Sequence, residues 1–146
     1  MLLGPSLWPP ENAVVDRLRV ILADDNPAIL DLVKHLLQKD FLVVATLDKS
    51  TAVIREAPEL NADVLILDIS MGELNGFEIT RQLRTKKCQS KIIFLTVHEE
   101  LDFIRAAFDA GASGYVFKSR INTDLRAAIT AVHSGRVFIP HAPIAQ

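Results

Sequence analysis

The stretch ADVLILDISMGELNG, residues 62–76, decides the fold of this chain. Its residues Val64 to Leu67 form a short unbroken apolar run, which is typical of a strand buried on both faces of a parallel sheet. The run ends in a carboxylate, Asp68. A lone acid in that place usually marks the point where a strand leaves the core for water, so any functional meaning of Asp68 depends on what the other strands carry.

Strand and helix patterns alternate along the chain around this stretch. The apolar runs predict strands at residues 19–24, 41–47, 63–68, 91–97 and 115–118. Amphipathic spacing predicts a helix after each strand: one with Asn26 as N-cap and Pro27 in its first turn, one near 50–57 that Pro58 stops, one at about 76–85, one that the glycine-rich segment 110–114 ends, and one with Leu125, Ala128, Ile129 and Val132 on one side. This alternation indicates an α/β fold, with one parallel sheet covered on both faces by right-handed crossovers.

Composition limits the protein to one well-cored domain. The chain has 146 residues, of which 49% are hydrophobic, and no apolar run approaches the roughly 18 residues of a membrane span. The net charge of -2 argues against a nucleic-acid or membrane surface. The single cysteine, Cys88, cannot form an internal disulfide, and it sits in a lysine-rich stretch typical of a solvated turn. We expect a cytoplasmic protein that binds no membrane and, by this chain alone, no nucleic acid.

Polar side chains stand at the ends of four of the predicted strands. Asp24 and Asp25 end the first strand, Asp68 the third, Thr96 lies near the end of the fourth, and Lys118 ends the fifth. In open α/β sheets, ligands bind beyond the carboxyl ends of the strands, at the point where the strand order reverses. If these strands are neighbours at that edge, three carboxylates, a hydroxyl and an ammonium converge on one crevice.

Such a crevice needs a compensating charge. Two carboxylates about 4 Å apart repel by roughly 4 kcal/mol at an effective dielectric constant of about 20, so three of them require a cation or a proton. Mg²⁺ is the natural cation, because it prefers oxygen ligands and completes its shell with water and phosphate oxygens. An ionised carboxylate also acts as a nucleophile without a general base, and aspartyl phosphates are known covalent intermediates. These residue types therefore point to phosphoryl chemistry.

These strand-end residues, in this order along the chain, resemble the receiver domain of bacterial two-component response regulators. The resemblance covers about residues 18–135, and Tyr115 matches an aromatic position that the family uses as a conformational switch. It implies a flavodoxin-like (βα)5 three-layer sandwich, whose five-stranded parallel sheet has the order 2-1-3-4-5.

The resemblance implies a chemical role for each residue of the crevice. Asp68 is the expected phosphoacceptor, and its expected partner is a sensor histidine kinase or a phosphotransfer protein. Mg²⁺ is the expected cofactor, with the carboxylates of Asp25 and Asp68 and the backbone carbonyl of Ser70 as direct ligands, and Asp24 acting through water. Lys118 would supply positive charge to the phosphoryl oxygens. The domain would thus be a signalling switch, catalysing only its own phosphorylation and dephosphorylation.

Two further residues are expected to carry the switch. By resemblance, Thr96 donates its hydroxyl to a phosphoryl oxygen and moves toward it. Tyr115, which would otherwise point toward the surface beside the fifth strand, turns inward into the space that Thr96 leaves. A local electrostatic event would in this way change the surface of the domain.

The crevice also departs from the family pattern. Met71 is followed by Gly72 where the family usually has proline, and a glycine is expected to loosen that loop. Val97 is bulkier than the small residue that usually follows the switch threonine, and is expected to restrict entry of phosphodonors or water. His98 and Glu99 are open between two interpretations, a place in the crevice and a place in an exposed loop.

The ends of the chain suggest three parts: an N-terminal extension (1–17), the receiver (18–135) and a C-terminal tail or linker (136–146). Residues 133–140, HSGRVFIP, resemble the segment that follows the receiver in regulators with a LuxR-type helix-turn-helix output domain. The sequence leaves open whether the chain is a stand-alone receiver or a piece of a transcription factor. A homodimer linked to phosphorylation is a further expected partner.

Two alternative functions come from other classes. The first is a degenerate receiver that acts only through protein contacts and is not phosphorylated. The second is a small α/β phosphotransferase, such as a haloacid-dehalogenase-like enzyme, whose nucleophile should be followed by a second acid two residues later. Ser70 occupies that place, which counts against the second alternative.

Overall fold

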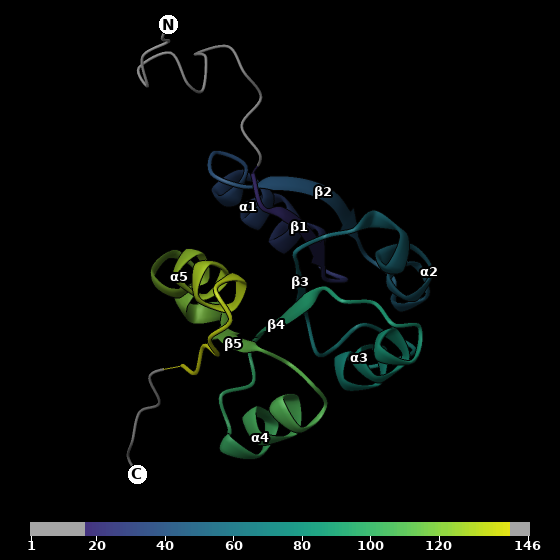
Figure 1. Ribbon diagram of the computed structural model, residues 1–146. Helices are drawn as coiled ribbons and strands as arrows, with labels where there is room; N and C mark the ends of the chain where they lie inside the picture. Colours follow the sequence, from purple (N-terminus) through teal and green to yellow (C-terminus); the bar gives the residue numbers. More distant parts are fainter. Residues whose placement is uncertain (1–16, 141–146) are drawn as a thin grey trace, which may run out of the picture.

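A single parallel sheet forms the centre of the molecule (Figure 1). The structure, a computed structural model, describes residues 17–140. Its strands are β1 (Arg19–Ala23), β2 (Leu42–Leu47), β3 (Val64–Leu67), β4 (Lys91–Thr96) and β5 (Gly114–Phe117). They pair in the order β2-β1-β3-β4-β5, and every pair is parallel. The predicted fold and strand order are therefore confirmed.

Helices cover both faces of this sheet, as expected for right-handed crossovers. They are α1 (Pro27–Leu37), α2 (Ser50–Leu60), α3 (Gly76–Thr85), α4 (Leu101–Asp109) and α5 (Ile121–His133). The core has two parts: α1 and α5 pack on one face of the sheet, and α2, α3 and α4 pack on the other (Figure 1). Successive residues of β1 show this division, since Ile21 faces one part and Leu22 the other.

Local signals place the start of two helices beside the carboxyl edge of the sheet. The Asn26 side chain accepts a hydrogen bond from the Ala28 backbone, which caps α1 and confirms the predicted start. Asn75 caps α3 in the same way. The next residue, Gly76, must be glycine, because a Cβ there would lie 2.5 Å from the Phe94 ring and 2.8 Å from the Asp68 carbonyl oxygen. The start of α3 therefore lies directly against the backbone of Asp68.

The prediction that Pro58 stops α2 is wrong. The helix continues to Leu60, and Asn61 ends it with a left-handed backbone of φ 53°. A proline inside a helix leaves the carbonyl four residues earlier without its backbone donor. That carbonyl, of Ile54, accepts a hydrogen bond of 3.3 Å from the Lys86 ammonium instead. A contact from outside the helix therefore replaces the missing bond.

After α5 the chain turns at Gly135 (φ 93°) and returns along β5. Phe138 forms an isolated parallel bridge with Gly114, at the edge of the sheet opposite β2. Residues 1–16 of the expected N-terminal extension and residues 141–146 of the expected tail lie outside the described residues. Within residues 17–140, none of the helices combines the length and the apolar character needed to cross a bilayer.

Candidate functional site

Acidic side chains gather at the carboxyl edge of the sheet. Asp24 and Asp25 follow β1, and Asp68 follows β3, its neighbour in the sheet. One carboxylate oxygen from each of the three lies within 4.8 Å of the others, and we call these residues the acidic cluster. The predicted convergence of the three acids is therefore confirmed.

Lys118 reaches this cluster from the end of β5. Its ammonium lies 2.8 Å from Oδ2 of Asp24 and 3.3 Å from Oδ2 of Asp68. The direct contact with Asp24 adds to the expected role of that residue, because Oδ2 of Asp24 is buried and has, within residues 17–140, no hydrogen-bond partner apart from this ammonium. Its other oxygen, Oδ1, accepts a hydrogen bond from the Asn26 backbone, which orients the carboxylate where the chain enters α1.

The charges of the site are not balanced by the protein alone. Burial raises the pKa of the Asp68 carboxyl, and the neighbouring charge of Asp24 raises it further, while Lys118 and a backbone hydrogen bond from Ser70 act in the opposite direction. Burial acts to lower the pKa of Lys118, but its hydrogen bond to Asp24 and the charges of both acids outweigh burial and raise this pKa. One ammonium among three carboxylates leaves room for a further positive charge.

The donor atoms of the cluster fit a hard divalent cation. They are carboxylate oxygens within reach of one common ion, and this is the ligand type that Mg²⁺ prefers. Asp25 is exposed, so waters can complete an octahedral shell on that side. Ser70 touches the cluster through its backbone hydrogen bond to Asp68. Ligation by its carbonyl oxygen stays a prediction.

Thr96 and Tyr115 are joined through the residue between their strands, His98. The Thr96 hydroxyl oxygen accepts a hydrogen bond of 3.2 Å from the His98 backbone N–H, which leaves its own hydrogen free to be donated. The Tyr115 hydroxyl donates a hydrogen bond of 2.8 Å to the His98 carbonyl. The sequence pattern does not predict this link, because Tyr115 and His98 lie 17 residues apart along the chain.

The expectation that Tyr115 points toward the surface is wrong for this structure. Its side chain is fully buried, with its ring next to those of Phe94 and Phe117. Burial raises the pKa of the phenol, and the nearby charges of Glu100 and Glu99 raise it further. The inward arrangement is favoured because the apolar ring contacts other rings while its hydroxyl finds a carbonyl partner.

Comparison with known protein families decides what this arrangement belongs to. A model of the response regulator receiver domain matches residues 20–130. This chain belongs to the response regulator receiver family. The receiver resembles the transcriptional regulatory protein RcsB of Escherichia coli K12, with 35% identity over 133 residues, and a nitrate/nitrite response regulator protein homolog of Haemophilus influenzae, with 34% over 126 residues. These matches cover 88% and 85% of this chain, but 62% and 61% of the relatives, so the chain spans about three fifths of their length.

Solved structures agree with this assignment. The isolated receiver domain of RcsB from Salmonella enterica serovar Typhimurium, determined with the phosphomimetic BeF3⁻, has a TM-score of 0.78 and 31% identity. The alignment covers 86% of this chain and 95% of the RcsB chain. A LuxR-family two-component response regulator from Aurantimonas sp. SI85-9A1 has a TM-score of 0.80 and 31% identity, over 84% and 89% of the two chains. The predicted resemblance to this branch of the family is confirmed.

The two departures of this receiver from the family pattern lie at the rim of its site. Gly72 has a φ of 85°, which proline cannot adopt, and a Cβ there would meet nothing within 4 Å. It lines a hollow of about 320 Å³ next to Asp25, together with Asp48, Lys49, Ser50, Thr51, Met71 and Glu73. Val97 is 66% exposed. The effects of both residues on reaction rates stay predictions.

The structure decides in part between the two interpretations of His98 and Glu99, a place in the crevice and a place in an exposed loop. The His98 ring stacks on Phe103 of α4, with ring centres 4.1 Å apart. The Glu99 carboxylate accepts a hydrogen bond of 3.1 Å from the Ser119 hydroxyl, which joins the loop after β4 to the short 3-10 helix Lys118–Arg120 that follows β5. These contacts position the loop at the rim of the receiver's site.

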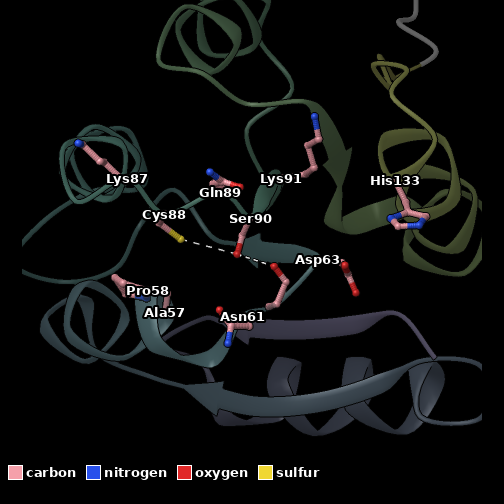
Figure 2. Close-up of a pocket in the computed structure, with 11 residues that line it drawn as sticks. Ala57, Pro58, Asn61, Asp63, Lys87, Cys88, Gln89, Ser90, Lys91 and His133 are labelled. Carbon is pink, nitrogen blue, oxygen red and sulfur yellow. Dashed lines mark hydrogen bonds between the residues drawn. The ribbon is translucent and has the colours of Figure 1, made fainter. Parts of the chain in front are cut away.

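A larger hollow lies at the opposite end of the sheet (Figure 2). It measures about 550 Å³ and includes Cys88, which is buried, so the prediction of a solvated turn is wrong for this side chain. The Cys88 thiol donates to the Ser90 hydroxyl at 3.7 Å, and that hydroxyl donates to the Ala62 carbonyl at 2.7 Å. These polar groups therefore satisfy one another. They lie at the amino ends of β3 and β4, whereas the acidic cluster lies at the carboxyl edge, so the hollow is separate from the acidic cluster.

Proposed function

We propose that this chain is a receiver activated by phosphorylation of Asp68 in a cytoplasmic two-component phosphorelay. The observation that carries the proposal is the pairing of the acidic cluster with Lys118 at the carboxyl edge of a receiver fold. The phosphodonor would be a sensor histidine kinase or a phosphotransfer protein. The presence of the nucleophile, the acids and the lysine in one site favours an active receiver over a degenerate one.

The transfer step assigns a task to each residue. A carboxylate oxygen of Asp68 forms a bond to phosphorus, while the bond from phosphorus to the donor atom breaks and that atom keeps the electron pair. The Lys118 ammonium approaches the phosphoryl oxygens and offsets their charge, which is the main requirement of a loose transition state. Asp25, Asp68 and the Ser70 carbonyl would hold Mg²⁺ directly, and Asp24 through water. When bound, Mg²⁺ supplies positive charge at the same oxygens.

The output of the receiver would lie outside residues 17–140. Relatives of this chain are named as transcriptional regulators, and one solved relative is described as a member of the LuxR family. We infer that the receiver controls a helix-turn-helix domain in a longer protein or acts on a separate partner, and that this chain alone does not bind DNA. Phosphorylation would change the surface through Thr96 and Tyr115, and a homodimer is one expected consequence.

The test of the proposal is the Mg²⁺ dependence of phosphorylation. Incubation with acetyl phosphate should add one phosphoryl group by intact-mass spectrometry when Mg²⁺ is present, and none when a chelator removes it, because the cluster is electrostatically unbalanced without a cation. Asp25→Asn should weaken Mg²⁺ binding by about tenfold or more, as measured by titration of backbone amide signals. Asp48→Asn, at the rim of the adjacent hollow, is the matched control. Equal labelling with and without Mg²⁺ would refute the proposal.

Thr96→Ala should separate phosphorylation from switching. The substitution removes neither the nucleophile nor a metal ligand, so the variant should still accept phosphate. It removes a hydroxyl that would bond the phosphoryl group in one state alone, a loss of about 1.5 to 3 kcal/mol, or more than tenfold in the population of the switched state. The measurement compares amide chemical shifts of Tyr115 and its neighbours with and without beryllium fluoride. Wild-type shifts in the variant would show that the hydroxyl is not the coupling group.

A further inference from the structure

The segment that follows α5 forms a short extra strand at the edge of the sheet. The Phe138 N–H donates to the Ser113 carbonyl at 2.9 Å, and the Tyr115 N–H donates to the Phe138 carbonyl at 3.1 Å. Residues 136–140, which we call the edge segment, thereby run parallel to β5 (Figure 1, yellow). Of the two backbone hydrogen bonds that join this segment to the sheet, one is made by Tyr115, the proposed switch residue.

The side chains of the edge segment divide into an inner and an outer set. Phe138 packs against the core part that α1 and α5 cover. It lies over Gly114, where even a Cβ would come within 3.5 Å of the Phe138 Cβ. Val137 and Ile139 are 59% and 62% exposed. Pro140 at the end of the segment is buried as well. The segment is therefore held at this edge by two inner side chains and by two backbone hydrogen bonds to the sheet.

The sequence prevents this strand from growing longer. In a parallel ladder, the next N–H toward β5 after that of Phe138 belongs to residue 140, and it would donate to the Tyr115 carbonyl. Residue 140 is proline, which has no N–H to donate. A strand limited to one bridge is attached weakly enough to exist in two states, docked and released.

Tyr115 connects this weak strand to the phosphorylation site. The Tyr115 hydroxyl donates a hydrogen bond to the His98 carbonyl, and the His98 N–H donates one to the Thr96 hydroxyl. The backbone N–H of Tyr115 donates to the Phe138 carbonyl. The buried side chain of Tyr115 and the docked edge segment are thus present together in one arrangement.

We propose that docking of the edge segment on β5 and binding of the phosphoryl group at Asp68 favour each other, with Tyr115 as the residue that both require. Coupling between two sites is reciprocal, so the segment must affect phosphoryl binding as much as phosphoryl binding affects the segment. The position of the edge segment would then depend on the phosphorylation state. This inference rests on the proposed function of Asp68.

A simpler role is that the segment only covers the exposed edge of β5, as edge strands often need. The two roles differ in what Phe138→Ala does. Loss of an edge cover lowers the stability of the fold and leaves the affinity for a phosphoryl mimic unchanged. Loss of a coupled element lowers that affinity.

The experiment is a titration of the full chain with beryllium fluoride at saturating Mg²⁺, followed by amide signals near Asp68. We expect Phe138→Ala to raise the apparent dissociation constant by about fivefold or more, within the usual range of coupling between sites. Ile139→Ala, on the outer side of the same segment, should stay within about twofold of wild type. Phe138→Leu, which keeps an apolar side chain, should recover most of the affinity.

A second measurement needs no variant and so does not depend on the folding of Phe138→Ala. In wild type, beryllium fluoride should slow hydrogen exchange of the Tyr115 and Phe138 amides by similar factors, while the Lys91 amide at the far end of the sheet serves as reference. An unchanged or tighter affinity in Phe138→Ala, or unchanged exchange in wild type, overturns the inference alone. Failure of wild type to bind beryllium fluoride overturns the proposed function and the inference with it.

Discussion

Asp68→Asn should not accept a phosphoryl group from any donor, which is the largest effect expected for this protein. An amide lacks the ionised oxygen that attacks phosphorus. Within the acidic cluster, Asp24 is the other carboxylate that contacts the Lys118 ammonium, and its Oδ1 already accepts a hydrogen bond from the Asn26 backbone. Intact-mass spectrometry after acetyl phosphate and Mg²⁺ measures the loss. Asp109→Asn, an exposed acid at the end of α4, should be labelled like wild type. Labelling of Asp68→Asn at the wild-type level would remove Asp68 from its role.

The stability of the same variant shows whether it is folded and tests the electrostatics. The pKa of Asp68 is raised in the fold, so the folded protein favours the protonated acid and loses stability as the pH rises through that pKa. Without Mg²⁺, Asp68→Asn should therefore unfold at a higher temperature than wild type at neutral pH. The difference should vanish below the ordinary pKa of 3.8, where both chains carry a neutral group. A variant less stable than wild type at neutral pH would contradict this account of the site.

Lys118→Met should slow phosphorylation by roughly 100- to 1000-fold, the range found when one group that stabilises transition-state charge is removed. The half-buried Lys118 ammonium contacts two acids of the cluster, and methionine keeps much of the length of lysine while removing its charge. The measurement is the rate of mass increase with acetyl phosphate at saturating Mg²⁺. Lys91→Met, an exposed position at the start of β4, is the matched control.

A loss of folding could imitate this effect, because the substitution leaves Asp24 and Asp68 buried without their cation. Circular dichroism and Mg²⁺ binding of Lys118→Met distinguish the two cases. A folded variant that binds Mg²⁺ and reacts slowly supports the role of the ammonium. A folded variant that reacts at the wild-type rate shows that the ammonium serves the structure alone.

Much of the fold was open to prediction because its signals are local. The buried strand at 64–67 is an unbroken apolar run, and the start of α1 is marked by a capping asparagine and a proline. The residues of the acidic cluster could be found for a related reason. Parallel strands deliver their ends to one edge, so a list of the residues that end each strand is also a list of neighbours in space.

The errors of prediction have one cause, which is contact between residues distant along the chain. Pro58 should end a helix by the local rule, yet the Lys86 ammonium satisfies the freed carbonyl. Cys88 lies among lysines, yet its side chain is buried in the core part that α2, α3 and α4 cover. Local composition reports how a residue behaves in an average environment, and in both cases the environment is supplied by another element.

The sequence by itself determined the strands, the helices and the chemical types that meet at the carboxyl edge, because apolar periodicity and residue identity are properties of short stretches. Only the tertiary structure decided that Lys118 pairs directly with Asp24, that Tyr115 is buried against His98, and that Phe138 returns to β5. These contacts join residues whose separation along the chain carries no period. Their existence depends on which surfaces the packed sheet and helices bring together, and no short stretch of sequence contains that information.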